Sequence, residues 1–351
     1  MKFRSHSSKG LSAGLNRRQM LKVLGAAGSA LALNGTSGME TLFASNSPTT
    51  ATGDLPRRAL GKTGLEVSAI CFGGAHWGRL KDDTEAIRLM HEAIDAGINF
   101  CDNAWEYNNG RSEELMGRAL VERRQRVILM TKVCSHGRGK KVAMQQLEES
   151  LRRLKTDYLD LWQIHEVIHE DDPDRHFMAG GEVEALVEAK RQGKVRFVGF
   201  TGHKEPRILL KMLSHDFPFD TCQIPLNVFD GTYRSFEREV LPVLNERGIA
   251  PLGMKSLTGN GEPIKQGIVN PEEAIRYVLS LPIASLVSGI DSPAVLKQNL
   301  DIVRRFTPMT AAEMNGLRVK VSRYAMDGRF EKFKRSIHHD GWVGREQHGL
   351  A

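Results

Sequence analysis

The chain has 351 residues, of which 26% are charged and 40% hydrophobic, as in a water-soluble globular protein with one large domain or two average ones. This composition excludes collagen-like, disordered and disulfide-dense proteins. The net charge of +7 comes mainly from a stretch before Glu40 that contains only basic charged residues, namely Lys2, Arg4, Lys9, Arg17, Arg18 and Lys22. The rest of the chain has 43 basic and 42 acidic residues, so its net charge of +1 gives no electrostatic reason to expect nucleic-acid binding.

Residues 1–54 have the pattern of an export signal and linker. A basic stretch is followed by a short apolar run at 23–33 and then by a segment rich in Ser, Thr, Asn and Gly. The apolar run is too short to span a bilayer, so we expect no stable membrane insertion after processing. The sequence NRRQMLK at 16–22 resembles the twin-arginine export signal, which implies a periplasmic protein and the twin-arginine machinery as a partner. Ala32 and Ala44 are candidate cleavage points, and the alternative is a basic tail with a chance arginine pair.

The four cysteines are widely spaced and include no CxxC pair, so their spacing does not fit a zinc knuckle or an iron-sulfur cluster. Each lies in or beside an apolar run, where a free cysteine behaves as a small hydrophobic residue. We therefore predict four reduced core cysteines, namely Cys71, Cys101, Cys134 and Cys222.

The remaining chain alternates short apolar runs with amphipathic stretches. Expected strands lie at 67–72, 99–101, 127–131, 158–164, 195–200, 221–224, 250–253 and 285–287. After the first and third runs, apolar residues recur at the spacing of an amphipathic helix, which predicts a helix in each place. Further helices are expected at 112–122, 182–191, 206–214, 236–247, 271–281 and 293–306. Eight such units predict a (β/α)8 TIM barrel over 55–310, with an open doubly wound sheet as the alternative. Residues 311–351 would form a C-terminal helical tail, with helical periodicity at 318–333.

Polar residues follow three successive strands, at the barrel end where chemistry is expected. Asp102 and Tyr107 follow the second strand, Lys132 ends the third, and His165 ends the fourth. A phenol is a poor acid at neutral pH unless a cation lies beside it. One unit charge at about 4 Å and an effective dielectric near 20 contributes roughly 4 kcal/mol, which corresponds to a pKa lowered by roughly 3 units. The sequence therefore predicts that Lys132 lowers the pKa of Tyr107.

These residues carry a resemblance to the aldo-keto reductase family over about 57–306. The segments RALGKTGLEVSAICFGG, DNAWEYNNGRSEELMGRAL and DYLDLWQIH, with the TK of the third strand, match the family pattern in order. The resemblance implies an NAD(P)H-dependent oxidoreductase that reduces a small aldehyde, ketone or sugar-like carbonyl, or oxidises the alcohol. It makes Tyr107 the general acid and Lys132 the residue that lowers its pKa. Asp102 would hold Lys132 by an ion pair, and His165 would orient the carbonyl.

The resemblance also implies cofactor contacts, although the sequence departs from the family in places. Gln223 and Thr201 suit the nicotinamide carboxamide, but Gly202 replaces the asparagine expected beside Thr201, and Met254 replaces a frequent stacking tyrosine. Lys255 would meet the pyrophosphate. Further contacts are expected from Gly73, Ser288, Gly289, Ser292, Gln298 and Asn299. NADPH is the family expectation. NADH stays open, because Gly289 and Val295 stand where many members carry basic residues, and Lys297 is the remaining base nearby.

Two other motifs have simpler interpretations. HEVIH at 165–169 fits the zinc-protease pattern HExxH, which requires a helix, but here the first His closes a strand and the acids before Pro173 would break a helix. Gly61-Lys62-Thr63 lacks the earlier glycine of a phosphate-binding loop, because Pro56 occupies that place. We therefore expect no metal, either here or at the tail histidines.

The tail at 311–351 could pack across the barrel or over the substrate opening, where Phe330 and Trp342 would form an apolar wall. A second hypothesis for the whole chain is a redox sensor or binding partner that holds its nicotinamide without turnover, because an exported compartment offers no obvious pool of reduced cofactor.

Overall fold

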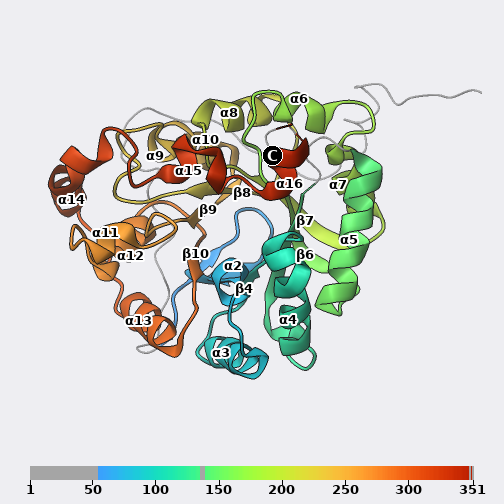
Figure 1. Cartoon of the computed structure of the whole chain (residues 1–351), viewed down its shortest axis with the longest axis horizontal. Coiled ribbons are helices and arrows are strands. Elements are labelled where there is room, and N and C mark those ends of the chain that lie inside the picture. The colour runs from blue at the N-terminus through green and yellow to red at the C-terminus, as the bar shows by residue number, and fades with distance from the viewer. Residues whose placement is uncertain (1–53, 135–138, 348, 350–351) are drawn as a thin grey trace, which may run out of the picture. The chain divides into compact units, whose positions relative to one another are not determined.

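The computed structural model describes residues 54–134, 139–347 and 349. Its strands form one closed parallel barrel in the order β10-β3-β4-β5-β6-β7-β8-β9, which confirms the predicted (β/α)8 fold (Figure 1). The barrel strands are β3 (Ile70–Gly73), β4 (Phe100–Asp102), β5 (Ile128–Val133), β6 (Leu159–Ile164), β7 (Val195–Thr201), β8 (Thr221–Pro225), β9 (Ala250–Met254) and β10 (Ser285–Gly289).

The first expected strand is divided in the structure. Two short strands, β1 (Arg57–Ala59) and β2 (Glu66–Ser68), form an antiparallel hairpin. The first barrel strand, β3, begins only after Ala69. The Ser68 hydroxyl donates to the carbonyl of Ile70 and the Ala69 amide donates to the carbonyl of Pro56, so the chain leaves the hairpin at this point. The hairpin packs into a cluster of buried residues that includes Leu60, Val67, Cys71, Phe100, Met130 and Leu161.

Helices surround the barrel and bury their apolar faces against the strands. The main ones are α3 (Asp83–Asp95), α4 (Arg111–Ala119), α5 (Lys140–Leu154), α7 (Glu182–Arg191), α8 (Pro206–Ser214), α10 (Leu241–Arg247), α12 (Pro271–Leu279) and α13 (Pro293–Arg304). Shorter turns are α2 (Gly74–Trp77), η1 (Tyr107–Gly110), η2 (Arg124–Arg126), α6 (Asp172–Phe177), α9 (Phe236–Glu239) and α11 (Glu262–Lys265). The helix expected at 236–247 is two helices, because Pro242 takes a first-turn position and starts α10.

The C-terminal part consists of α14 (Ala311–Ala325), α15 (Lys332–Arg335), η3 (Ile337–His339) and α16 (Trp342–Gln347). The prediction of a helix at 318–333 is wrong at both ends. The helix begins earlier because Thr310 and Glu313 form a capping box, and it ends at Ala325 before the turn at Gly328. Phe330 is buried against Phe229 and Tyr324, whereas Trp342 is 51% exposed, so these two side chains do not form one apolar wall.

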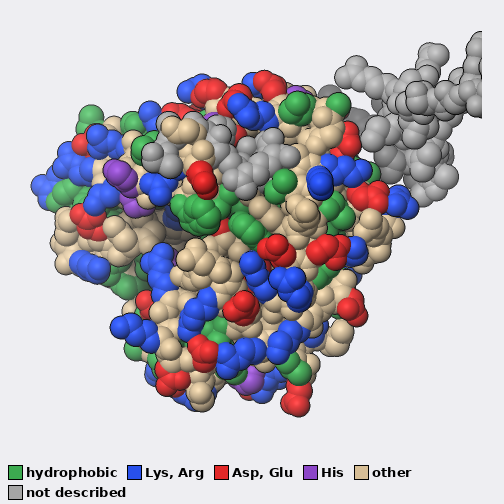
Figure 2. Space-filling view, turned by 45° about the vertical axis from the view of Figure 1, so that its right-hand side comes forward, with side chains coloured by type: hydrophobic (Ala, Val, Ile, Leu, Met, Phe, Trp, Pro, Cys, Tyr) green, Lys and Arg blue, Asp and Glu red, His purple; other side chains and the backbone are tan. Residues whose placement is uncertain are grey.

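The surface has no single dominant charge on the face shown in Figure 2, where basic and acidic side chains are interspersed. All four cysteines are free and buried, which confirms their prediction as reduced core residues. Among the residues that the structure describes, no helix combines the length and hydropathy needed to cross a membrane.

Candidate active site

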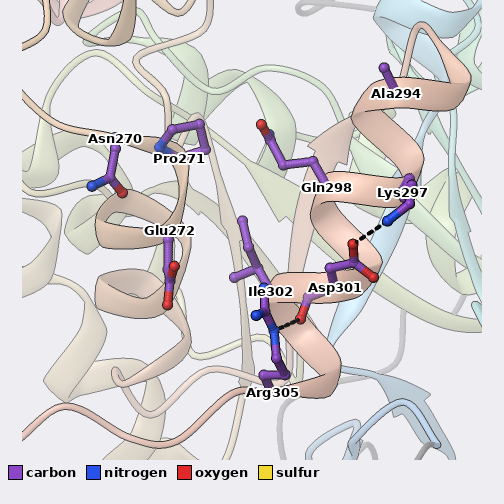
Figure 3. Close-up of a pocket in the computed structure, with 9 residues that line it drawn as sticks. All are labelled: Asn270, Pro271, Glu272, Ala294, Lys297, Gln298, Asp301, Ile302 and Arg305. Carbon is purple, nitrogen blue, oxygen red and sulfur yellow. Dashed lines mark hydrogen bonds and ion pairs between the residues drawn. The ribbon is translucent and has the colours of Figure 1, made fainter.

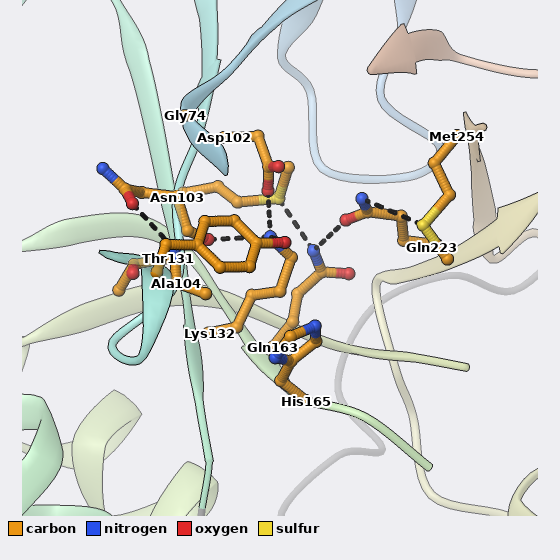
Figure 4. A network of polar contacts seen from close by, with 12 residues as sticks. Gly74, Asp102, Asn103, Ala104, Thr131, Lys132, Gln163, His165, Gln223 and Met254 are labelled. Atoms are coloured by element: carbon orange, nitrogen blue, oxygen red, sulfur yellow. Dashed lines mark hydrogen bonds and ion pairs between the residues drawn. The ribbon is translucent and has the colours of Figure 1, made fainter. Parts of the chain in front are cut away.

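An ion pair between two adjacent strands forms the centre of the candidate site. Asp102 ends β4, and Lys132 lies in β5 near its carboxyl end. The Lys132 ammonium contacts the Asp102 carboxylate and donates to the Asn103 carbonyl at 2.7 Å. The two side chains are only 1% and 3% exposed, so each charge depends on the other for compensation. Figure 4 shows Asp102, Lys132, Gln163 and His165 directed toward one region at the end of the strands.

Tyr107 joins this pair from the loop after β4. Its hydroxyl lies 3.2 Å from Lys132 Nζ, and its ring is 4.7 Å from the same nitrogen. His165 follows β6 directly and meets the Tyr107 ring edge to face, with 5.7 Å between ring centroids. The structure therefore brings together the acid, phenol, amine and imidazole that the sequence singled out.

The pKa of Tyr107 corrects one prediction. Burial raises this pKa well above its usual value, and the charges of Asp102, Glu106 and Glu166 raise it further. The prediction that Lys132 lowers this pKa below its usual value is wrong for this structure. The physical reason is that the Asp102 carboxylate offsets the field of Lys132, while burial penalises the phenolate. At neutral pH the phenol therefore keeps its proton.

His165 has two close neighbours that the sequence reasoning missed. Glu106 Oε1 lies 3.0 Å from His165 Nδ1, and the sulfur of Cys134 lies 3.9 Å from the same nitrogen. One ligand atom from each of these three residues lies within 4.8 Å of the others. The signal for Glu106 was an acid directly before Tyr107 in a loop leaving a barrel strand. Cys134 gave no signal, because it was interpreted only as a core residue.

The HExxH pattern does not lie on a helix. Residues 165–168 have no regular secondary structure and precede the turn into α6. The prediction that both histidines lack the helical arrangement is confirmed. No helix runs from His165 to Pro173, and a separate short helix, α6, begins at Asp172 with Pro173 in its first turn. Gly61-Lys62-Thr63 lies in the turn of the β1–β2 hairpin.

Two expected carboxamide contacts lie beside each other on adjacent strands: Thr201 ends β7, and Gln223 is the middle residue of β8. Gln223 accepts a hydrogen bond from Gln163 Nε2 at 3.1 Å, and its own amide nitrogen lies 3.7 Å from the sulfur of Met254 (Figure 4). Thr201 is buried, and its hydroxyl has no hydrogen-bond partner within the described part of the chain. A buried hydroxyl without a partner is costly unless a ligand supplies one.

The other expected cofactor residues gather where β3 and β10 end. Gly73 pairs with Gly289, and a Cβ at Gly73 would come within 2.7 Å of the Ser288 carbonyl oxygen. Asn299 donates to the Ser288 hydroxyl at 3.0 Å, and Ser292 caps α13. These residues form one local unit around the first turns of α13.

Gln298 points instead into a groove of about 540 Å³ between α12 and α13 (Figure 3). Lys297 borders the same groove and pairs with Asp301 at 2.7 Å. Tyr107, Lys132 and His165 do not line this groove. We therefore place the candidate reaction centre at the barrel mouth rather than in this groove.

Lys255 follows β9 and lies beneath the tail. Its ammonium faces the ring of Phe333 at 5.3 Å, and burial lowers its pKa from 10.5 to about 8. His203, which follows β7, also packs against Phe333 and lies 3.1 Å from Glu166. Burial lowers the pKa of His203 to about 3, so this imidazole is neutral. The tail thus borders the side of the site that departs from the family pattern.

A parallel (β/α)8 barrel with an Asp, Tyr, Lys and His at the ends of consecutive strands has the architecture of an oxidoreductase. Comparison with known proteins agrees, because residues 69–262 match the model of the aldo/keto reductase family. This match covers more than half of the chain, and the chain belongs to the aldo/keto reductase family.

Relatives extend the likeness beyond the matched segment. The chain is 27% identical over 297 residues to the uncharacterized oxidoreductase YqkF of Bacillus subtilis, covering 72% of this chain and 92% of that protein. It is 31% identical over 223 residues to L-galactose dehydrogenase of Arabidopsis thaliana, covering 59% and 68%. The holo form of the aldo-keto reductase AKR11C1 from Bacillus halodurans aligns with a TM-score of 0.64 at 26% identity, covering 76% and 96%.

Proposed function

We propose that the chain transfers hydride between a nicotinamide dinucleotide and a small aldehyde, ketone or sugar-like carbonyl, or the corresponding alcohol. One observation carries this proposal: the Tyr107 hydroxyl lies 3.2 Å from an ammonium that is itself paired with Asp102, beside the ring of His165. The name of the L-galactose dehydrogenase relative supports a sugar-like alcohol or carbonyl as one substrate class to test.

The residues present fit a nicotinamide ring and its carboxamide. Thr201 offers a buried hydroxyl without a partner among the described residues, and Gln223 offers an amide directed toward the same side. When bound, the dinucleotide supplies a hydride to the carbonyl carbon or accepts one from the alcohol carbon. NADPH is the proposed form. NADH remains a candidate because Lys297, the base nearest the expected adenine end, is 78% exposed and already paired with Asp301.

The four polar side chains of the site have different roles toward the substrate oxygen. Tyr107 donates its hydroxyl proton to that oxygen, a contribution of about 10²- to 10⁴-fold in proton-transfer steps. Lys132 stabilises the resulting phenolate at 3.2 Å, and Asp102 holds Lys132 in place. His165 orients the oxygen by a hydrogen bond. A phenol whose pKa is raised by burial donates its proton only when such stabilisation is available.

Residues 1–54 lie outside the described residues apart from Asp54, and we propose for them the role of an export signal and linker. The corresponding division assigns 55–310 to the barrel and 311–351 to the tail. Under this proposal the protein reaches the periplasm through the twin-arginine machinery. A fusion of residues 1–54 to a reporter tests this idea, because Arg17→Lys combined with Arg18→Lys should block its export, whereas Lys9→Arg should not.

The decisive experiment combines binding and turnover with the purified full chain. Fluorescence titration with NADPH and NADH measures affinity and phosphate preference, and a panel of carbonyls measures turnover. Tyr107→Phe should lower kcat by about 10²- to 10⁴-fold and leave the dinucleotide Kd unchanged. Undiminished turnover by this variant would contradict the proposal. A dinucleotide that co-purifies without exchange, with no carbonyl reduced, would instead favour the redox-sensor hypothesis.

A further inference from the structure

Glu106 and Tyr107 are consecutive residues that both face His165. The turn that carries them is fixed by backbone hydrogen bonds, since the amide of Trp105 donates to the carbonyl of Lys132 and the amide of Tyr107 donates to that of Ala104, each at 3.0 Å. Glu106 Oε1 lies 3.0 Å from His165 Nδ1, and the two side chains are 7% and 11% exposed. The pair therefore lies within the site and is partly protected from solvent.

The tail also confines the Glu106 carboxylate. Gly341 lies against it, and a Cβ at this glycine would come within 2.8 Å of both Glu106 oxygens. The Gly341 amide donates to Glu166 at 2.5 Å, and its neighbour Asp340 pairs with Lys204. The position of Glu106 is therefore set on one side by the η1 turn and on the other by the docked tail.

We propose that Glu106 is a positioning residue: by holding Nδ1 of His165, it fixes the orientation of the ring and presents Nε2 to the substrate oxygen. This inference rests on the proposed function, because it assigns His165 the substrate oxygen. The assignment comes from the Glu106–His165 contact of this chain.

The chemistry follows from the two nitrogens of imidazole. A neutral ring that donates its Nδ1–H to Glu106 has a lone pair on Nε2, so it can only accept a hydrogen bond there. That form suits an alcohol, whose hydroxyl donates. A ring protonated on both nitrogens donates from Nε2 and suits a carbonyl oxygen, while Glu106 supplies the counter-charge. Because His165 keeps its protons while the hydride is transferred, reduction and oxidation are one path run in opposite directions, and the form of the ring that serves one direction serves the other.

The proton and electron balance is unaffected by this role. In reduction the carbonyl carbon receives the hydride from the dinucleotide, and the electron pair of the C=O bond moves to oxygen. The oxygen takes its proton from Tyr107, and His165 keeps its own protons throughout. Glu106 touches neither the substrate nor the transferred proton, so its effect passes entirely through the imidazole.

Three other titratable groups interact with this ring. Tyr107 and Cys134 contact it, and Asp102 interacts with it electrostatically. Burial raises the pKa of the Cys134 thiol well above its usual value, and Glu106 raises it further, so this sulfur remains neutral. Glu106 is the carboxylate that directly contacts Nδ1.

The test compares Glu106→Ala and Glu106→Gln with wild type in both reaction directions. The amide oxygen of Gln can still accept the Nδ1–H, whereas Ala removes the acceptor. We expect Glu106→Ala to lower kcat by about 10- to 100-fold, equally in both directions, and Glu106→Gln to restore part of it. The dinucleotide Kd should remain unchanged. Glu92→Gln, which changes an exposed acid on α3, is the matched control and should leave kcat unchanged.

Each outcome distinguishes this inference from the proposed function. If Glu106→Ala has the wild-type kcat in both directions while Tyr107→Phe is inactive, the positioning role is wrong and the proposed function survives. If wild type reduces no carbonyl, or Tyr107→Phe remains fully active, the proposed function itself fails.

Nitrogen NMR of labelled histidine in the wild-type chain provides a second readout that does not need a folded variant. The neutral ring of His165 should carry its proton on Nδ1. A proton on Nε2 would overturn the inference. So would a chelator-sensitive metal on Nδ1, held with Glu106 and Cys134.

Discussion

The two sides of the barrel mouth differ in how their polar groups are held. On the β4–β6 side, Lys132 contacts both Asp102 and Tyr107, and each of the three lies in a barrel strand or in the loop after it. On the β7–β9 side, Thr201 has no partner among the described residues, and Lys255 faces the aromatic ring of Phe333. The first side is preorganised for chemistry on an oxygen, whereas the second is shaped by the tail and leaves polar groups for a ligand.

We expect the largest effect on the β4–β6 side from Lys132→Met. It leaves the Asp102 carboxylate buried without its partner, which costs about 3–5 kcal/mol of stability, and it removes the cation beside Tyr107. We expect turnover to fall by at least about 10²-fold. Steady-state kinetics and chemical denaturation measure the two effects.

The loss of stability in Lys132→Met should depend on pH in a defined direction. Burial raises the pKa of Asp102 above its usual 3.8 even beside Lys132. A carboxyl whose folded pKa is raised binds its proton more tightly in the folded state, so the stability it contributes is lost as pH rises through that value. Lys132→Met should therefore be most destabilised at neutral pH and least in acid. The double variant with Asp102→Asn should recover stability but not turnover, and recovery of both would contradict the assigned roles.

We expect removal of Lys334, in the C-terminal tail, to lower the stability of the protein as much as removal of Lys132. Its ammonium is buried and lies 2.6 Å from Asp230 and 2.9 Å from Glu331. Lys334→Met leaves both carboxylates without their cation, with an expected loss of about 3–5 kcal/mol in the free energy of unfolding. Burial raises the pKa of Glu331 from 4.5 to about 7, so the loss should be larger above pH 7 than below pH 4.5.

Lys332→Met is the matched control for this prediction. Lys332 belongs to the same helix but pairs with Glu262 at 49% exposure, so its removal should cost less than about 1 kcal/mol. Urea denaturation of both variants distinguishes a buried anchor from a surface pair. Equal, small losses would show that the tail does not depend on the buried cation.

The difference between the two sides also explains what the sequence could predict. Asp102, Lys132 and His165 come at the ends of apolar runs, and the strand order of a barrel brings such ends together. The raised pKa of Tyr107 could not be predicted, because it depends on burial and on carboxylates from other loops. Phe333 over Lys255 and Gly341 against Glu106 are contacts of the tail with distant loops, and no local periodicity encodes them.

Lys255 offers a smaller test of the side bordered by the tail. Burial lowers its pKa from 10.5 to about 8, so between these values the unfolded chain binds more protons than the folded one. The contribution of Lys255 to the free energy of unfolding therefore rises with pH across this window, and its penalty is complete below pH 8. Lys255→Met should remove this dependence, whereas the exposed Lys265→Met should keep it.

If Lys255 meets the pyrophosphate, dinucleotide binding should also take up a proton near pH 8, because an adjacent anion favours the charged ammonium. Calorimetry in buffers of different ionisation enthalpy measures this uptake. A proton uptake that persists in Lys255→Met would assign it to another group.

Thr201→Val is expected to have the smallest effect and to be the most specific. The buried Thr201 hydroxyl has no partner among the described residues, so replacing it with a methyl group should leave the stability of the free protein unchanged or slightly higher. If the hydroxyl binds the carboxamide, its loss should weaken dinucleotide binding by about 0.5–1.5 kcal/mol, or roughly 2- to 13-fold in Kd. Thr131→Val is the matched control, because the buried Thr131 hydroxyl already donates to Glu113 at 2.6 Å and so links β5 to α4. That variant should lose stability with Kd unchanged, and the same pattern in Thr201→Val would assign Thr201 to the core rather than to the cofactor.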